Sequence, residues 1–580
     1  MRPRTRFASW LVALSLGLVA VTFAQAGGGW SDDPAENLSV ADGAGDQILP
    51  KLAYDFRTWV SWFDGIGTGY DVRVQVLEFD GTALLPHNGV LVADRSFSSV
   101  QDYGLDVDLT TGRAVLAFRD DRFTGTQITA ASVARDGTLV WGANGVQLTN
   151  TTAFVASPKI ASIFDDGIVV AWTEGSSTRL QKLDVNGVPQ WPGDVVLTPA
   201  AGSYSVSDLH ATTGAVVLSI VHQTGGFGSP RHILAQKFDT NGNALWGATP
   251  VAVFDGGSIQ LGNFPPFTMD EWGGATFAWY STSPLSCFVQ RLLPDGTEAF
   301  PHNGVSVSTN TSRVRVSPTA VADGFSGDVY AFWEEKDSLQ SQSGLYGQKV
   351  DSSGNRLTPE GIEIVALGAT QITQIRSTIS GTFGAHVYWN GAASFGQDRL
   401  FGAHLDPSGA IDLAPFDISS TPSGKSRLVV APALGLAFPT SRGLPADGYS
   451  VLAWSDGRTD GGDIFAQPVR WDGYLGVPVS SGAAPIDLPA SGFRLAVHPN
   501  PLRGSTRIDY AVPLEGSIAL ALAIHDVTGR LVRSFPTSAP NGSIAWDGTD
   551  SAGTPVAAGV YFVRLGANGD GATRTLTVVR

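Results

Sequence analysis

The chain has 580 residues, of which 43% are hydrophobic, 16% are charged, 69 are glycine and 33 are proline. These values exclude a disordered chain, because enough apolar residues are present for a core, and a coiled coil, which needs many more charged residues. The net charge of −16 disfavours nucleic-acid binding, and the single cysteine, Cys287, excludes an internal disulfide and a cysteine-ligated zinc site.

The first 26 residues have the pattern of a secretory signal peptide. Three arginines precede an apolar run from about Trp10 to Phe23, which ends in Ala24-Gln25-Ala26. A basic start, a short apolar stretch and small residues at a cleavage site are typical of such peptides. The run is short for a membrane span, although an anchor helix is the alternative, and no later stretch is long enough for one. We expect residues 1–26 to be removed on export.

A motif of about 55 residues repeats through the middle of the chain. A strand-like run ending in a glycine turn recurs at Gly81, Gly137, Gly187, Gly242, Gly296, Gly354, Gly409 and Gly473. A glutamine stands six residues before six of these glycines: Gln75, Gln181, Gln236, Gln290, Gln348 and Gln467. An aromatic residue ends the preceding apolar run in seven copies: Trp62, Phe118, Trp172, Trp279, Trp333, Trp389 and Trp454. The fourth copy has Ile220 instead, and the columns stay in phase through eight copies.

Each copy reads as four antiparallel strands separated by turns, and no long stretch has a helical period. The pattern predicts an all-β fold with a propeller of eight blades over residues 27–478; seven blades are the fallback count, and a linear solenoid is the competing architecture. Residues 35–44 resemble the last strand of a copy, whereas the eighth copy lacks one. We therefore expect the N-terminal strand to complete the last blade and close the ring, which removes an open sheet edge.

The repeated residues are interpreted mainly as scaffold. The aromatic rings are expected to fill the wedge between neighbouring blades, and a stacking surface for sugars is the alternative. The glutamines are expected to satisfy buried backbone groups between blades.

Carboxylates follow the aromatic residue in five copies: Asp64, Asp120, Glu174, Glu335 and Asp456. They would form an acidic ring able to bind Ca²⁺, or they cap exposed turns, which is the reading we favour. The best metal candidate is the loop with Asp456, Asp460 and Asp463, although Arg458 occupies a position where a ligand is expected. No other cofactor is expected.

Catalytic motifs are hard to find in this sequence. It has no nucleophile elbow, no His-Glu-x-x-His pair and no P-loop, so no catalytic residue is assigned. A hydrolase acting on carbohydrate would need acids unique to particular blades that converge in the central funnel. The candidates for such a role are His222, Asp270, Glu271 and Glu334.

The C-terminal part has a different pattern. Residues 479–493 are rich in Gly, Pro, Ser and Ala and are predicted to be a linker. Residues 494–580 read as about seven short strands, which predicts a small Ig-like β-sandwich. Its motif residues are Asn500, Pro501, Asp526, Gly529, Arg530, Trp546, Asp547, Gly548, Gly559, Tyr561 and Arg574.

These motifs resemble the Ig-like domain of flagellar hook-capping proteins and the type A C-terminal sorting domain of the type IX secretion system. The second resemblance implies passage across the outer membrane and attachment at the surface, with the translocon and the attachment machinery as partners. A plain structural appendage is the alternative, because a free Ig-like module shares most of these motifs.

The sequence therefore predicts an exported propeller, secreted or at the surface of a Gram-negative-type bacterium, with the periplasm as the alternative location. We expect a binding or structural module with a glycan or protein ligand, no nucleic-acid partner and no membrane span. A secreted carbohydrate-active hydrolase with acids in the funnel is the alternative function.

Overall fold

The computed structural model describes residues 29–55, 57–65, 69–96, 103–270, 273–324, 326–380, 384–432, 449–476, 494–498, 502, 506–511, 520–526, 530–537, 541–567 and 570–579. Every regular element in these ranges is a β-strand. None of these residues forms a helix long and apolar enough to cross a membrane. The predicted signal peptide (1–26) and linker (479–493) lie outside the described residues.

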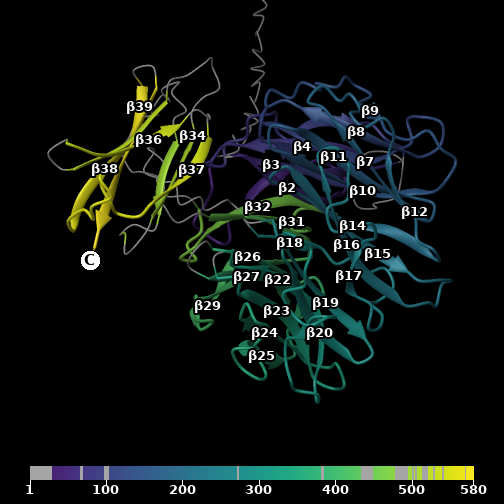
Figure 1. The fold of residues 1–580 in the computed structure, drawn as a ribbon. Coiled ribbons are helices and arrows are strands. Elements are labelled where there is room, and N and C mark those ends of the chain that lie inside the picture. The colour runs from purple at the N-terminus through teal and green to yellow at the C-terminus, as the bar shows by residue number, and fades with distance from the viewer. Residues whose placement is uncertain are drawn as a thin grey trace, which may run out of the picture.

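Between Leu38 and Arg470 the described residues form eight four-stranded sheets, which we call blades 1 to 8 (Figure 1). Blade 1 comprises β2 (Gln47–Tyr54), β3 (Thr58–Asp64), β4 (Asp71–Leu77) and β5 (Val90–Ala93), and blade 2 comprises β6 (Gly104–Asp108), β7 (Arg113–Asp120), β8 (Gln127–Val133) and β9 (Val146–Gln147). Blade 3 comprises β10 (Val155–Ile163), β11 (Gly167–Glu174), β12 (Ser177–Leu183) and β13 (Val195–Leu197), and blade 4 comprises β14 (Ser203–Thr212), β15 (Ala215–Gln223), β16 (Arg231–Asp239) and β17 (Val251–Phe254).

The second half of the ring has the same order. Blade 5 comprises β18 (Phe267–Met269), β19 (Ala275–Thr282), β20 (Leu285–Leu292) and β21 (Val305–Ser306), and blade 6 comprises β22 (Val314–Ala322), β23 (Val329–Lys336), β24 (Ser343–Val350) and β25 (Ile362–Gly368). Blade 7 comprises β26 (Gln371–Ile379), β27 (Ala385–Ala392), β28 (Asp398–Leu405) and β29 (Ile411–Ser423), and blade 8 comprises β30 (Lys425–Pro432), β31 (Tyr449–Asp456), β32 (Asp463–Arg470) and β1 (Leu38–Ala41).

The ring is closed at blade 8 by the N-terminal strand. β1 pairs antiparallel with β32, with Leu38 opposite Ala466 and Ala41 opposite Ile464. The first strand of each blade packs against the first strand of the next, and β30 of blade 8 packs against β2 of blade 1. These first strands therefore surround the axis of the ring, and we call them the inner strands.

The eight repeat glycines have a conformational reason. Their φ angles lie between 80° and 88°, a region that other residues rarely adopt. In the turn at Gly242, for example, the glycine N–H donates to Asp239 O at 3.0 Å, and the Asp239 carboxylate accepts from the backbone of Asn241. The glycine column thus marks the turn that follows the third strand of every blade.

A β-bulge with the same backbone conformation recurs in five of the inner strands. In each, one non-glycine residue has φ between 49° and 57°: Leu49, Ser157, Ser317, Gln374 and Arg427. Two residues of each bulge have no direct partner in the second strand of the blade. The register of the pairing between the first and second strands therefore shifts at the bulge. Because the bulge recurs, it belongs to the scaffold, whereas the side chain it displays differs from blade to blade.

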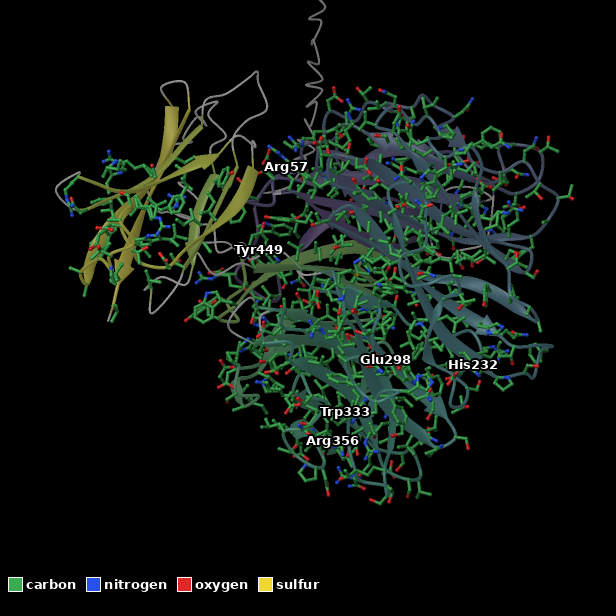
Figure 2. All side chains as sticks on the ribbon, viewed as in Figure 1. Arg57, His232, Glu298, Trp333, Arg356 and Tyr449 are labelled. Carbon is green, nitrogen blue, oxygen red and sulfur yellow. The ribbon has the colours of Figure 1, made fainter. Side chains whose placement is uncertain are left out.

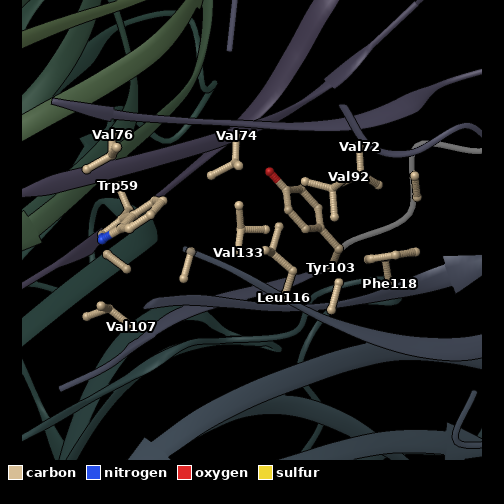
Figure 3. Close-up of a cluster of buried hydrophobic side chains, with 14 of the residues drawn as sticks. Trp59, Val72, Val74, Val76, Val92, Tyr103, Val107, Leu116, Phe118 and Val133 are labelled. Carbon is tan, nitrogen blue, oxygen red and sulfur yellow. The ribbon is translucent and has the colours of Figure 1, made fainter. Parts of the chain in front are cut away.

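The hydrophobic core is divided among the contacts between neighbouring blades. Figure 3 shows one such cluster, in which Trp59, Val74 and Val76 of blade 1 meet Leu116 and Phe118 of blade 2. The alternation of β-branched and aromatic residues along the middle strands buries both faces of each sheet. No blade can shield its own faces alone, which explains why the repeats assemble into a ring.

The C-terminal domain is a β-sandwich. Its described strands are β33 (Arg494–His498), β34 (Thr506–Ala511), β35 (Leu520–Asp526), β36 (Leu531–Thr537), β37 (Asn541–Trp546), β38 (Gly559–Ala567) and β39 (Asp570–Val578). They form the sheets β33-β34-β37 and β36-β35-β38-β39. Ile508 and Trp546 of the first sheet and Ile524 and Val563 of the second belong to one buried cluster. The all-β prediction, with a propeller followed by an Ig-like sandwich, is confirmed.

Candidate functional site

The aromatic column is buried between blades. Its seven residues are at most 2% exposed, and each belongs to a cluster that includes residues of the preceding blade. Trp62 of blade 1, for instance, packs with Ala453 and Ile464 of blade 8, and Trp333 lies among the sheets in Figure 2. A ring buried to this extent has no face available to a sugar, so the column serves packing.

The glutamines differ from expectation. They bond mainly within their own blade, where they hold the connection to the fourth strand. Gln236 accepts from Lys237 N at 2.9 Å and from Trp246 N at 3.1 Å, and donates to Gly247 O at 3.0 Å. Gln348 is an exception, because it also donates to Val307 O of blade 5. The glutamine side chain therefore takes the place of backbone hydrogen bonds between the third strand and the segment that follows the glycine turn.

The repeated carboxylates are neutralised by arginines. The pairs are Asp64–Arg73 at 2.5 Å, Asp120–Arg122 at 2.8 Å, Glu174–Arg179 at 3.3 Å, Glu335–Arg315 at 3.0 Å and Asp456–Arg458 at 2.6 Å. In three blades the carboxylate also accepts from the indole of the aromatic column, as Asp456 does from Trp454 at 2.8 Å. These acids anchor the end of the second strand rather than forming an open acidic ring.

The candidate metal loop is occupied by protein cations. Asp456 is fully buried and lies 2.6 Å from Arg458 Nη2 and 3.3 Å from Lys425 Nζ. Asp460 accepts from Gly462 N, and Asp463 from the Thr459 hydroxyl. Two cations already balance Asp456, so its oxygens are poor ligands for Ca²⁺. Over the described ranges, no group of three or more His, Cys, Asp or Glu side chains is placed to hold a metal ion.

The blade-specific candidates from the sequence are not brought together. Asp270 pairs with Arg291 at 2.6 Å, and Glu334 pairs with Lys336 at 2.7 Å. His222 bonds to Ala201 O at 3.1 Å. Each partner belongs to the same blade, and Glu271 lies outside the described residues.

Instead, a cluster of blade-specific charged residues lies on four consecutive inner strands, β2, β6, β10 and β14. Its members, which we call the axial cluster, are Lys51, Asp106, Lys159, Asp208 and His210. Lys51, Lys159 and Asp208 pair with the residue that directly precedes the aromatic column, a position we call the first level. Asp106 and His210 lie at the second level, which is the next position along the inner strand whose side chain is on the same face. At the second level the other blades have only Ala, Val or Thr.

The axial cluster is held by bonds within blade 4 and between blades 2 and 3, and the charge of Asp208 on blade 4 interacts with Lys159 of blade 3 and Lys51 of blade 1. His210 Nε2 lies 3.0 Å from Asp208 Oδ2, and the Asp106 carboxylate accepts from Ser162 N of blade 3 at 2.8 Å. The His210 side chain remains 43% exposed and packs edge-on against Phe267 of blade 5. Solvent therefore reaches His210, whereas the side chain of Asp208 is only 15% exposed.

The two carboxylates of the axial cluster have opposite pKa shifts. Burial raises the pKa of Asp106 to about 6, against the backbone bonds it accepts from Ser162 and Val107. Burial also acts to raise the pKa of Asp208, but His210, Lys159 and Lys51 outweigh it, and the pKa of Asp208 is lowered. Burial lowers and Asp208 raises the pKa of His210, with a net increase. Carboxylates whose pKa values are driven apart in one place are typical of functional sites.

Sequence reasoning missed the axial cluster because it searched the ends of the second strands. A usable signal was present: Asp106 and His210 break a column of small residues in the first strand of the repeat. The bulge hides this column in the sequence. The bulged inner strands contain residues that have no counterpart in β6, so equivalent positions of the repeats do not align.

A second polar chain lies in blade 7. His404 Nδ1 is 2.6 Å from Asp412 Oδ1, and His404 Nε2 is 2.7 Å from Ser380 Oγ. The order acid, histidine, serine matches that of a hydrolase triad. However, His404 is 2% exposed, and Ser380 bonds Gly384 O through both its hydroxyl and its N–H. We interpret these hydrogen bonds as structural, because they connect the β26–β27 turn to the outer strands of the blade.

The C-terminal motif residues build the sandwich. Trp546 is fully buried, donates to Thr549 O at 2.7 Å and contacts Tyr561 edge-on. Asp526 and Asp547 accept backbone bonds in turns, from Arg530 N and Thr549 N. Gly548 has φ 73°, and burial lowers the pKa of Arg574. Asn500, Pro501 and Gly529 lie outside the described residues, and Gly559 begins β38.

Comparison with known proteins supports the C-terminal domain. Residues 501–571 match the model of the FlgD Ig-like domain. Comparison with curated proteins finds no match for this sequence.

Among solved structures, the chain is similar to a prolyl endopeptidase, with 15% identity, a TM-score of 0.38 and coverage of 71% of this chain and 53% of that chain. It is similar to PorZ, a surface component of the type-IX secretion system of Porphyromonas gingivalis, with 13% identity, a TM-score of 0.23 and coverage of 91% and 81%. It is also similar to the propeller of Dos1, with 12% identity, a TM-score of 0.41 and coverage of 75% and 95%. The chain spans about half the length of the prolyl endopeptidase. The propeller assignment rests on this chain's own sheets and strand pairing.

Proposed function

We propose that the protein is an exported binding module whose propeller recognises a ligand at the ring axis. The observation that carries this proposal is the axial cluster, in which charged residues specific to four blades converge while the repeated residues are buried or paired. A scaffold alone has no need of Asp106 and His210 at positions where the other blades have small residues. Charged groups that remain partly exposed, as His210 does, are available to a ligand.

Binding is tested with the purified protein on an array of glycans and with surface proteins of Gram-negative-type bacteria. A ligand that binds the wild type and binds Asp208→Asn at least about tenfold more weakly supports the proposal, because a charged hydrogen-bond partner contributes about 1.5–3 kcal/mol. Glu78→Gln, outside the cluster and paired with Arg57, is the matched control. Binding that is equal in wild type and Asp208→Asn would contradict a site at the axis.

The second candidate function is hydrolysis of a carbohydrate, which the opposite pKa shifts of Asp106 and Asp208 favour. Asp106, protonated up to about pH 6, has the property of a general acid, and Asp208 that of a base or nucleophile. A hydrolysis screen on the same glycans distinguishes the two functions. Turnover that Asp106→Asn or Asp208→Asn abolishes would replace the binding proposal with the enzymatic one.

For the C-terminal domain we propose a role in sorting, with the translocon and surface-attachment machinery as partners and the outer surface as the destination. Its support is the FlgD Ig-like match together with the motif residues that resemble type A sorting domains. Deletion of residues 494–580 is expected to hold the protein in the periplasm. Surface delivery of the shortened chain at the wild-type level would favour a structural appendage.

A further inference from the structure

Two arginines lie on neighbouring inner strands on the opposite part of the ring from most of the axial cluster. Arg376 is on β26 of blade 7, and Arg427 is in the bulge of β30 of blade 8. These strands pack against each other. Arg376 stands opposite Tyr388, the residue before the aromatic column, and so shares the level of Lys51, Lys159 and Asp208.

The bulge displays Arg427 rather than burying it. Arg427 lies between the paired residues Ser426 and Val429 and has φ 57°. A bulge of this kind re-aims a side chain out of the regular alternation of the strand. Arg427 is exposed, whereas its neighbour Leu428 is 1% exposed.

Neither arginine forms an ion pair with a carboxylate of the described residues. The bond found for Arg376 is from Nη1 to Ile375 O, at 2.8 Å. Most arginines of the ring are paired, as Arg458 is with Asp456 and Arg399 with Asp417. Burial and, to a smaller extent, the positive charge of Arg427 lower the pKa of Arg376 to about 10, which shows that the two guanidinium groups repel each other.

The inner strands thus carry charge unevenly. On blades 1 to 4 the cations Lys51 and Lys159 both interact with the carboxylate of Asp208. On blades 7 and 8 the two guanidinium groups have no acidic counterpart among the described residues, in a protein whose net charge is −16. An anion placed between two guanidinium groups would relieve their repulsion and accept charge-assisted hydrogen bonds.

We propose that Arg376 and Arg427 bind a single anionic group of the ligand: a carboxylate, a sulfate or a phosphate. This inference deepens the proposed function and rests on it, since it places the anionic end of the ligand against blades 7 and 8. The rest of the ligand, uncharged or cationic, would then face the axial cluster. The amide of Gln374, at the bulge position of blade 7 that corresponds to Arg427, is available as a further donor.

The test is calorimetric titration of the full purified chain with sodium glucuronate, sodium sulfate and inorganic phosphate at low ionic strength. The variants are Arg427→Ala and Arg376→Gln, and the matched control is Arg399→Ala, whose arginine lies on blade 7 and pairs with Asp417 at 2.7 Å. We expect at least one anion to bind, at least about tenfold weakening in each axial variant and no change in the control. The anion that binds most tightly identifies the chemical group.

Two results would overturn the inference: binding of none of the three anions, or equal binding by wild type and both axial variants. Arg427 is exposed, so Arg427→Ala is expected to melt at the wild-type temperature, which separates lost binding from lost folding. A neutral glycan that requires Asp208 but not Arg427 would remove the anion site and leave the proposed function intact. If the array finds no ligand that depends on Asp208 and the titration finds no anion that depends on the two arginines, both the proposed function and the anion site are rejected.

Discussion

Replacement of Arg458 by alanine tests how the ring is held closed. Arg458 Nη2 bonds Asp456 at 2.6 Å, Ser419 of blade 7 at 3.0 Å, and Asn37, the residue before β1, at 3.0 Å. Its guanidinium also lies 4.1 Å from the ring centroid of Phe465. One side chain therefore joins the last two blades to the N-terminal segment.

The magnitude follows from the burial of its partner. Asp456 has no exposed side-chain surface, and removing one partner from a buried pair costs about 3–5 kcal/mol. Because Lys425 Nζ stays 3.3 Å from Asp456, we expect the lower end, about 3 kcal/mol. Arg458→Met keeps the apolar stem over Phe465, so the difference between the two variants separates packing from charge.

The assay is urea unfolding followed by tryptophan fluorescence, together with limited proteolysis near residue 37. Arg399→Ala is the control, because its exposed pair with Asp417 should contribute only about 0.2–1 kcal/mol. Arg458 does not hold the ring closed if Arg458→Ala unfolds within about 1 kcal/mol of this control and the N-terminal segment resists proteolysis as in the wild type.

Three further results are expected. Gln236→Ala should lower the free energy of unfolding by about 1–3 kcal/mol in urea titrations, because the buried N–H of Trp246 loses its acceptor; a wild-type value would contradict this role. Cys287 is fully buried and burial raises its pKa, so Ellman's reagent should react only after denaturation; rapid reaction of the native protein would show the burial to be wrong. Protonated Asp106 stabilises the fold below about pH 4, and this contribution is lost as pH rises to about 6; Asp106→Asn should flatten the melting temperature over that window, and an unchanged profile would argue against the raised pKa.

The propeller and its closure were predictable because they depend on a period. The glycine column marks turns that require positive φ, and the aromatic column marks the interface between blades, so both recur wherever the scaffold does. The strand β1 was found by the same means, as a last strand that precedes the first complete copy.

The candidate site was not predictable in the same way, since function lies in departures from the period. Asp106 and Asp208 are about one hundred residues apart in the sequence, and only the ring brings their strands near each other. The glutamines show a related limit: their spacing revealed a structural role, but not that the side chain turns back on its own blade.

Strand β1 is made early and its partner β32 late, with seven complete sheets between them. A growing polypeptide therefore cannot seal the circle until translation has almost finished the propeller. Until then, the early strand β1 presents an unsatisfied edge. Chaperones that keep the unfinished chain extended would protect such an edge, and premature termination before residue 463 would leave the early strand without its partner.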